Sequence, residues 1–129
     1  MENKKHLQKT NGFEQLVAWQ KAQELAVTVY QLTKKFPADE RFALTDQIRR
    51  AASSISANLA EGYGRRGIND KIHFYIIAYG SLLELKSHLY LAVKLGYASM
   101  SEIEIITNLG EDCQKLINAL VRSIKQNEK

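Results

Sequence analysis

Two glutamates, Glu61 and Glu84, are the first residues of this sequence that could do chemistry. If folding brought them together, two carboxyl groups could share acid and base work in catalysis. The same residues could instead form ion pairs or hydrogen bonds between helices, and a carboxylate pair alone lacks the third group that orients a catalytic site. We therefore expect both glutamates to be structural, and we predict no catalytic residue and no enzyme.

A short basic segment could provide a second kind of chemistry, which is anion binding. Arg65, Arg66 and Lys71 lie within residues 62–71, where Asp70 is the one acidic residue. Arginine side chains match phosphate oxygens geometrically, and the start of a helix attracts anions. These three residues form the predicted nucleic-acid-binding site. The alternative is a solvated charged loop, because short basic clusters are common.

The same segment matches the letters of the dinucleotide-binding fingerprint G-x-G-x-x-G, as Gly62-Tyr-Gly64-Arg-Arg-Gly67. That fingerprint requires a preceding β-strand and a helix that opens inside it. A helical pattern precedes it here, and no strand pattern occurs elsewhere in the sequence. We interpret the glycines as the end of one helix and a loop to the next, and we predict no nucleotide cofactor.

Metal and thiol chemistry have little support in the sequence. The histidines, His6, His73 and His88, are scattered and form no ligand motif with Cys113 or a carboxylate, so no metal site is predicted. Cys113 lies on an apolar helical stripe and is interpreted as a small core residue. A single cysteine cannot form an internal disulfide, which agrees with a reducing compartment.

Composition limits the protein class further. The chain has 129 residues, 45% hydrophobic and 25% charged, which suits one globular domain. A net charge of +4 permits nucleic-acid binding without arguing strongly for it. No run is apolar and long enough to span a bilayer, and the N-terminus lacks the apolar core of a signal peptide. We therefore expect a cytoplasmic protein.

Four helical patterns position these residues. They cover about 13–35, a second stretch that begins within 39–45 and ends at Gly62, then 69–95, and a fourth that begins near Ser99 or Ser101. Ser99 with Glu102 and Ser101 with Glu104 are competing capping boxes for the fourth. The short connections predict an all-α, antiparallel up-down-up-down four-helix bundle. We assign residues 12–127 to this domain and residues 1–11 to a flexible N-terminal tail.

The second helical pattern has two distinct edges. Its apolar edge consists of Leu44, Ile48, Ala51, Ala52, Ile55 and Leu59. The adjoining edge is rich in side chains that form hydrogen bonds, which can fix the register between helices. Together with Glu84 of the third pattern, it supplies a predicted structural polar network of Gln47, Arg50, Asn58, Glu61 and Glu84.

The third helical pattern is unusually apolar. On a helical wheel its hydrophobic residues cover roughly 220°, whereas a helix with one buried side needs a stripe only somewhat wider than about 100°. Surplus apolar surface usually marks a contact with a partner. We predict a homo-oligomer interface at Phe74, Tyr75, Tyr79, Leu82 and Leu85. The alternative is that the core of the bundle surrounds this helix completely.

Several motifs carry a family resemblance. They are Phe36-Pro37-x-x-Glu40, Leu44-x-x-Gln47-Ile48-Arg49-Arg50-Ala51, Ser54-Ile55, Asn58-Leu59-Ala60-Glu61-Gly62 and Ala78-Tyr79-Gly80-Ser81-Leu82-x-Glu84-Leu85. With them the chain resembles a bacterial family of four-helix-bundle proteins, some encoded by intervening sequences inside 23S ribosomal RNA genes. A related protein, the accessory protein of diversity-generating retroelements, forms a pentameric barrel that binds a reverse transcriptase and nucleic acid. The resemblance implies a homopentamer by analogy.

These observations lead to one functional expectation and two alternatives. We expect a non-catalytic oligomeric adaptor that binds nucleic acid, foremost RNA, or a protein that handles nucleic acid. A structural or protein-interaction homo-oligomer without affinity for nucleic acid is the first alternative. An enzyme that uses Glu61 and Glu84 is the second.

Overall fold

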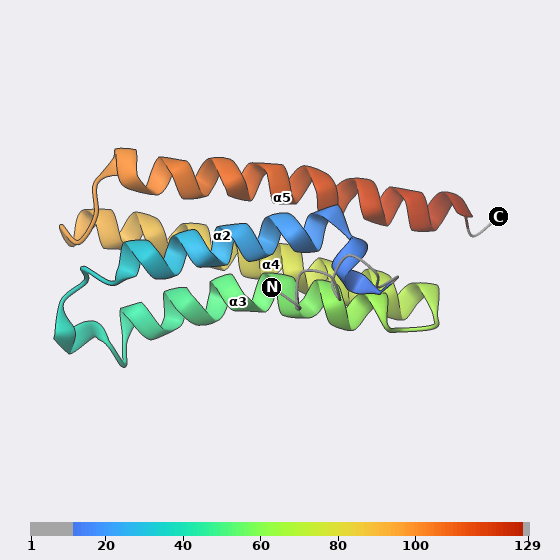
Figure 1. Ribbon diagram of the computed structural model, residues 1–129, viewed down its shortest axis with the longest axis horizontal. Helices are drawn as coiled ribbons and strands as arrows, with labels where there is room; N and C mark the ends of the chain where they lie inside the picture. Colours follow the sequence, from blue (N-terminus) through green and yellow to red (C-terminus); the bar gives the residue numbers. More distant parts are fainter. Residues whose placement is uncertain (1–11, 128–129) are drawn as a thin grey trace, which may run out of the picture.

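Four long α-helices lie side by side in the computed structural model, which describes residues 12–127, and no β-strand occurs in that range (Figure 1). The elements are η1 (Phe13–Gln15), α2 (Val17–Thr33), η2 (Ala38–Glu40), α3 (Leu44–Tyr63), α4 (Ile68–Lys94) and α5 (Met100–Asn127). The predicted all-α fold is therefore confirmed, and the arrangement is consistent with a four-helix bundle. The predicted tail, residues 1–11, lies outside the described residues.

Local sequence signals explain where the helices begin and end. Helix α2 stops at Thr33, shortly before Phe36-Pro37, because the residue before a proline disfavours helical backbone. Gly96 follows α4 with φ of 84°, a conformation that glycine adopts without strain. The Ser99–Glu102 capping box begins α5: the Glu102 N–H donates to Ser99 Oγ at 3.1 Å, and the Ser99 N–H donates to Glu102 Oε1 at 2.9 Å.

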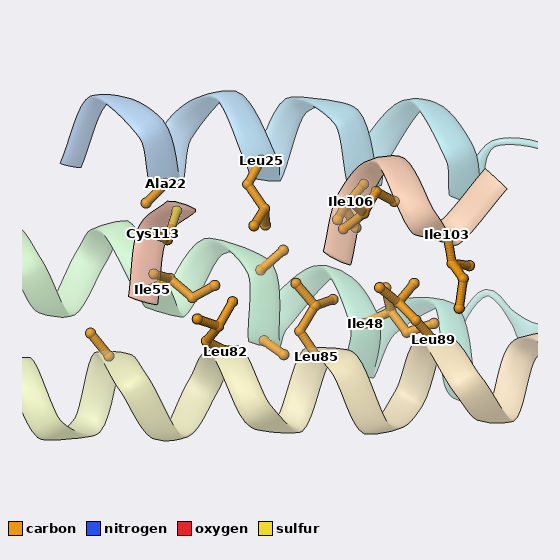
Figure 2. Packing of buried hydrophobic residues seen from close by; sticks show 14 of the residues in the cluster. Ala22, Leu25, Ile48, Ile55, Leu82, Leu85, Leu89, Ile103, Ile106 and Cys113 are labelled. Carbon is orange, nitrogen blue, oxygen red and sulfur yellow. The ribbon is translucent and has the colours of Figure 1, made fainter. Parts of the chain in front are cut away.

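The core lies where the apolar edges of all four helices meet. Leu25 of α2, Ile55 of α3, Leu85 of α4 and Ile106 of α5 point into the same space (Figure 2) and are at most 1% exposed. Every residue of the predicted apolar edge of α3 is buried. Within residues 12–127, no helix combines the length and the apolar character that a membrane crossing needs.

The structure corrects the predicted role of Gly62. Helix α3 continues past it to Tyr63, and Gly64, in right-handed helical conformation, is the C-cap. Gly62 is buried against α4, where an added Cβ would lie 2.7 Å from Tyr75 Cε1 and 3.0 Å from Phe74 Cβ. Glycine is thus required here for the close approach of α3 and α4, and it does not end the helix.

Candidate nucleic-acid interface

Arg65 lies in the four-residue connection between α3 and α4 and contacts both helices. Its Nη2 is 2.9 Å from Glu61 Oε2, and its guanidinium carbon lies 4.6 Å from the centroid of the Phe74 ring. The carboxylate offsets part of the arginine charge, while stacking on Phe74 holds the guanidinium plane in place. Arg65 therefore presents a positioned cation whose affinity for an anion is reduced by Glu61.

Lys71 stabilises the end of α3. Its Nζ donates hydrogen bonds to the carbonyl oxygens of Tyr63 at 2.7 Å and Gly62 at 3.4 Å, and it lies 5.4 Å from the centroid of the Tyr63 ring. A cation at these carbonyls satisfies groups that the helix leaves unpaired and complements the negative end of its dipole. Lys71 thus has a structural role, whatever it contacts outside the chain.

Arg66 differs from its two basic neighbours. Its side chain is exposed, and it has no hydrogen-bond or ion-pair partner among residues 12–127. Of the three cations predicted to bind nucleic acid, Arg66 is the one whose charge is fully available. The glycine-rich letters around it belong to a helix end, a loop and the N-cap of α4 at Gly67, which is not the context of a dinucleotide site.

The predicted polar network is only partly present within the protomer. Arg50 Nε lies 2.7 Å from Asp46 Oδ2 on its own helix, and this hydrogen bond raises the pKa of Arg50. Within the chain Arg50 therefore does not pair with a glutamate of a neighbouring helix. Gln47 is exposed beside it on α3.

Asn58 belongs to the part of the network that does connect two helices. Its Nδ2 donates to the Ser54 carbonyl oxygen at 2.8 Å and to Ser54 Oγ at 2.9 Å. Ser54 Oγ lies 2.9 Å from Ser81 Oγ of α4. These small side chains allow α3 and α4 to approach closely while their polar atoms stay paired.

Glu61 and Glu84 do not form a joint site in the protomer. Glu61 pairs with Arg65, and Glu84 Oε2 lies 3.4 Å from His88 Nε2, so each glutamate contacts a residue four positions further along the chain. Across residues 12–127, no group of three or more His, Cys, Asp or Glu is arranged to hold a metal ion. Cys113 is fully buried, as predicted, and burial raises the pKa of its thiol to about 11.

Helix α4 hides much of its apolar surface inside the protomer. Tyr75, Leu82 and Leu85 are 1%, 6% and 1% exposed, so three of the five predicted interface residues have little surface left for a partner. The other two, Phe74 and Tyr79, are half-buried. Helices α3 and α5 cover the three buried residues. A helical wheel describes one helix alone, so it could not predict which residues the neighbouring helices cover.

A different set of apolar residues on α4 remains exposed. Ile76, Leu83 and Tyr90 are 59%, 48% and 40% exposed, and they follow one another at intervals of seven residues. This spacing places them along one stripe of the helix, as in helices that pack against a second helix along their length. We call these three residues the exposed α4 stripe.

Burial of Tyr75 predicts a loss of stability at alkaline pH. Removal from water raises its pKa from 10.0 to about 12. Between pH 10 and pH 12 the unfolded chain has released the phenol proton, whereas the folded chain retains it. The contribution of Tyr75 to the free energy of unfolding is therefore complete below pH 10 and falls as the pH rises through this range. We expect Tyr75 to cost about 2 kcal/mol of unfolding free energy by pH 12.

Urea unfolding of the wild type and of Tyr75→Phe across this pH range measures the effect. The Phe variant should show a shallower alkaline decline, whereas Tyr90→Phe, on the exposed part of the same helix, should follow the wild type. Parallel curves for wild type and Tyr75→Phe would contradict the assignment.

Two arginine–aromatic contacts at and near the α2–α3 connection were not predicted from the sequence. The Arg41 guanidinium lies 5.9 Å from the ring centroid of Phe42, which is 88% exposed, and the Arg49 guanidinium lies 4.7 Å from the ring of Tyr30. An arginine directly followed by phenylalanine, between Pro37 and the start of α3, was the available signal. The contacts escape a search for local motifs, because their residues are spread over α2, the loop before α3, and α3 itself.

The family model for the 23S rRNA-intervening sequence protein matches residues 14–119. Four chains of known structure match as well. One is the crystal structure, at 1.70 Å resolution, of a protein of unknown function from the S23 ribosomal protein family of Bacteroides thetaiotaomicron. It is 27% identical, with a TM-score of 0.74, and the alignment covers 81% of this chain and 98% of that one. No curated protein matches this chain.

Proposed function

The chain belongs to the 23S rRNA-intervening sequence protein family, and from this membership we propose that it is a non-catalytic, oligomeric adaptor that binds nucleic acid in the cytoplasm. RNA is the foremost ligand, and a protein that handles nucleic acid is the other partner of this class. The family name links such proteins to ribosomal RNA, and the chemistry of the surface supports the link independently.

The observation that carries the proposal is the set of arginine–aromatic contacts at both ends of the helices. Arg65 stacks on Phe74 beside the α3–α4 connection, and Arg49 stacks on Tyr30 near the α2–α3 connection; Figure 1 shows these connections at opposite ends. Proteins that bind single-stranded nucleic acid combine cations for the backbone with aromatic rings for the bases. Arg66 adds a cation that no carboxylate within residues 12–127 neutralises.

Self-association is the second part of the proposal. We take the protomer as an antiparallel up-down-up-down bundle whose exposed α4 stripe packs against a second copy, because large exposed apolar side chains along one line favour a helical partner. A closed ring of five copies follows the analogy with the pentameric accessory protein of diversity-generating retroelements. In a ring each weak contact with a phosphate would be repeated, so avidity would raise the overall affinity.

The exposed α4 stripe also favours a second candidate function. A homo-oligomer that acts only through protein contacts would need this stripe and would not need the arginine–aromatic contacts. The two functions separate in an assay for nucleic acid. An enzymatic role receives less support, because Glu61 and Glu84 form separate, exposed contacts with different partners, Arg65 and His88.

Light scattering and an RNA gel shift on the same sample test the proposal. We expect a molar mass several times that of the 14.7 kDa chain and a shift of structured RNA that weakens steeply as salt rises. Arg65→Ala combined with Arg66→Ala should weaken binding about tenfold or more, since each phosphate contact removed costs roughly 1 kcal/mol or more.

The matched control is Lys86→Ala combined with Lys115→Ala, which removes the same amount of positive charge from exposed positions on α4 and α5. It should leave most of the binding intact. An intact oligomer that shifts no RNA at low salt would leave the protein-interaction function. Equal losses in both double variants would mean that net charge, and not the α3–α4 connection, determines binding.

A further inference from the structure

A hollow of about 290 Å³ lies at the corner between α2 and α3. Its lining consists of Thr33, Lys34, Phe36, Pro37, Ala38, Arg41, Thr45 and Arg49. Three of these residues are cationic, and none is acidic. A hollow with three positive charges and no carboxylate in its wall attracts anions and disfavours cations.

Arg49 is held in place without losing its charge to an acid. Its Nε donates to Thr33 Oγ1 at 2.8 Å, and its guanidinium stacks on Tyr30. The Thr33 hydroxyl in turn donates to the Val29 carbonyl oxygen at 2.9 Å, so it accepts from the arginine in a fixed orientation. A guanidinium positioned in this way can offer its remaining N–H groups to an oxyanion at little entropic cost.

The start of α3 adds further donors. Thr45 lies in the first turn of this 20-residue helix, where the backbone carries positive potential, and the N-cap residue forms no side-chain hydrogen bond there. The Thr45 side chain is 6% exposed, yet its Oγ1 has no hydrogen-bond partner within residues 12–127. Buried hydroxyls are nearly always paired, so this one in the wall of a cationic hollow is a donor that a ligand or a water can pair.

The neighbouring acids lie outside the wall of the hollow. Glu40 accepts the Tyr97 hydroxyl at 2.7 Å and the Leu44 N–H at 3.2 Å, and Asp46 pairs with Arg50. Asp39 is exposed on η2 and is absent from the wall. The wall itself therefore carries the three positive charges of Lys34, Arg41 and Arg49, while the Glu40 carboxylate at the start of α3 offsets part of the positive potential there.

We propose that this hollow binds a phosphate group, with Arg49 as the positioned contact, Lys34 and Arg41 as flanking cations, and the Thr45 hydroxyl as a neutral donor. Phe42, 88% exposed beside Arg41, offers a ring on which a nucleic-acid base can stack. The phosphate source we expect is therefore the backbone of single-stranded RNA. That source rests on the proposed function, whereas the phosphate site itself does not.

Titration of the isotope-labelled full chain with inorganic phosphate, followed by NMR, tests the site directly. The Arg49 Nε–H and Thr45 amide signals should shift and saturate with a dissociation constant of roughly 1 mM or below. Sodium chloride at matched ionic strength should not reproduce these shifts. Lys34→Gln combined with Arg41→Gln removes two exposed cations without touching the core, and it should weaken binding about tenfold or more.

Thr45→Val separates a ligand contact from a merely structural hydroxyl. Valine keeps the shape and removes the donor, so phosphate binding should weaken severalfold while the fold is retained. Lys86→Gln combined with Lys115→Gln is the control of equal charge and should bind phosphate as the wild type does. Shifts that chloride reproduces, or binding that survives the loss of Lys34 and Arg41, would overturn the phosphate site.

A labelled single-stranded RNA identifies the source of the phosphate. Phe42→Ser should weaken RNA binding and leave inorganic phosphate binding unchanged. Saturable phosphate binding without RNA binding would keep the site, assign it to a small phosphorylated molecule, and overturn the RNA source. RNA binding that depends on Arg65 and Arg66 but leaves the Arg49 and Thr45 signals unmoved would overturn RNA as the source of the phosphate and keep the adaptor.

Discussion

Gly62→Ala should destabilise the protein by about 2–3 kcal/mol, near the upper end of the usual cost of overpacking a core. A Cβ at this position would lie 2.7 Å from Tyr75 Cε1 and 3.0 Å from Phe74 Cβ. The Tyr75 ring is 1% exposed and has little room to turn away, and the Phe74 Cβ is fixed to the backbone of α4. The two helices would therefore have to separate, which disturbs the contacts along their whole interface.

Thermal unfolding measures this effect, and we expect the melting temperature to fall by roughly 10 °C. Gly80→Ala is the matched control, since Gly80 lies in α4 and a Cβ added there would meet no neighbouring group within 4 Å. Alanine there should raise stability by about 0.5–1 kcal/mol, because glycine is a poor helix residue. If alanine lowers the stability at position 62 and raises it at position 80, then the close approach of α3 and α4, and not helix propensity, determines the result at Gly62. A stabilised Gly62→Ala variant would refute the close contact.

The helices themselves could be predicted because their signals are local. Spacing of apolar residues, the proline after Phe36 and the Ser99–Glu102 capping box each act within one or two helical turns. The apolar edge of α3 was predicted completely for the same reason. Gly62 was misinterpreted because a glycine near a helix end usually marks a cap, and its contact with Tyr75 involves another helix.

The candidate sites could be predicted only in part, because they depend on which helices are neighbours. The basic residues after α3 were found from the sequence, yet their partners were not: Arg65 stacks on Phe74, and Lys71 caps α3. The hollow between α2 and α3 combines Lys34, Arg41 and Arg49 from separate segments, and no spacing rule joins them. A surface site whose residues come from separate segments can be recognised only when the structure shows which segments are neighbours.

The interface prediction shows the same limit. The wheel correctly indicated more apolar surface on α4 than one side could bury, but it could not indicate which residues the neighbouring helices cover. Tyr75, Leu82 and Leu85 turned inward, and the exposed α4 stripe remained outside. Adjacent residues on one helix can therefore differ completely in burial. Ile105 and Ile106 of α5 are such a pair, and their substitution measures the difference in stability that follows.

Ile106→Ala should cost about 3–4 kcal/mol of unfolding free energy, the largest effect we expect from a single substitution here. Ile106 is 1% exposed and contributes to the core where α5 meets the other helices (Figure 2). Removing three carbons there loses the hydrophobic transfer energy and leaves a cavity that the surrounding helices can only partly close. Urea unfolding at a fixed protein concentration measures the loss.

Ile105→Ala is the matched control, because Ile105 is the same residue type in the same helix and is 61% exposed. As an isolated surface residue it should change stability by no more than about 0.5 kcal/mol. Comparable losses for the two variants would contradict the burial pattern of a lone protomer and mean that residue 105 is covered in solution. If that second loss also grew with protein concentration, the cover would be another copy, because association stabilises the folded state by mass action. The pair of variants thus measures the core and, through the same experiment, whether a second copy covers this face of α5.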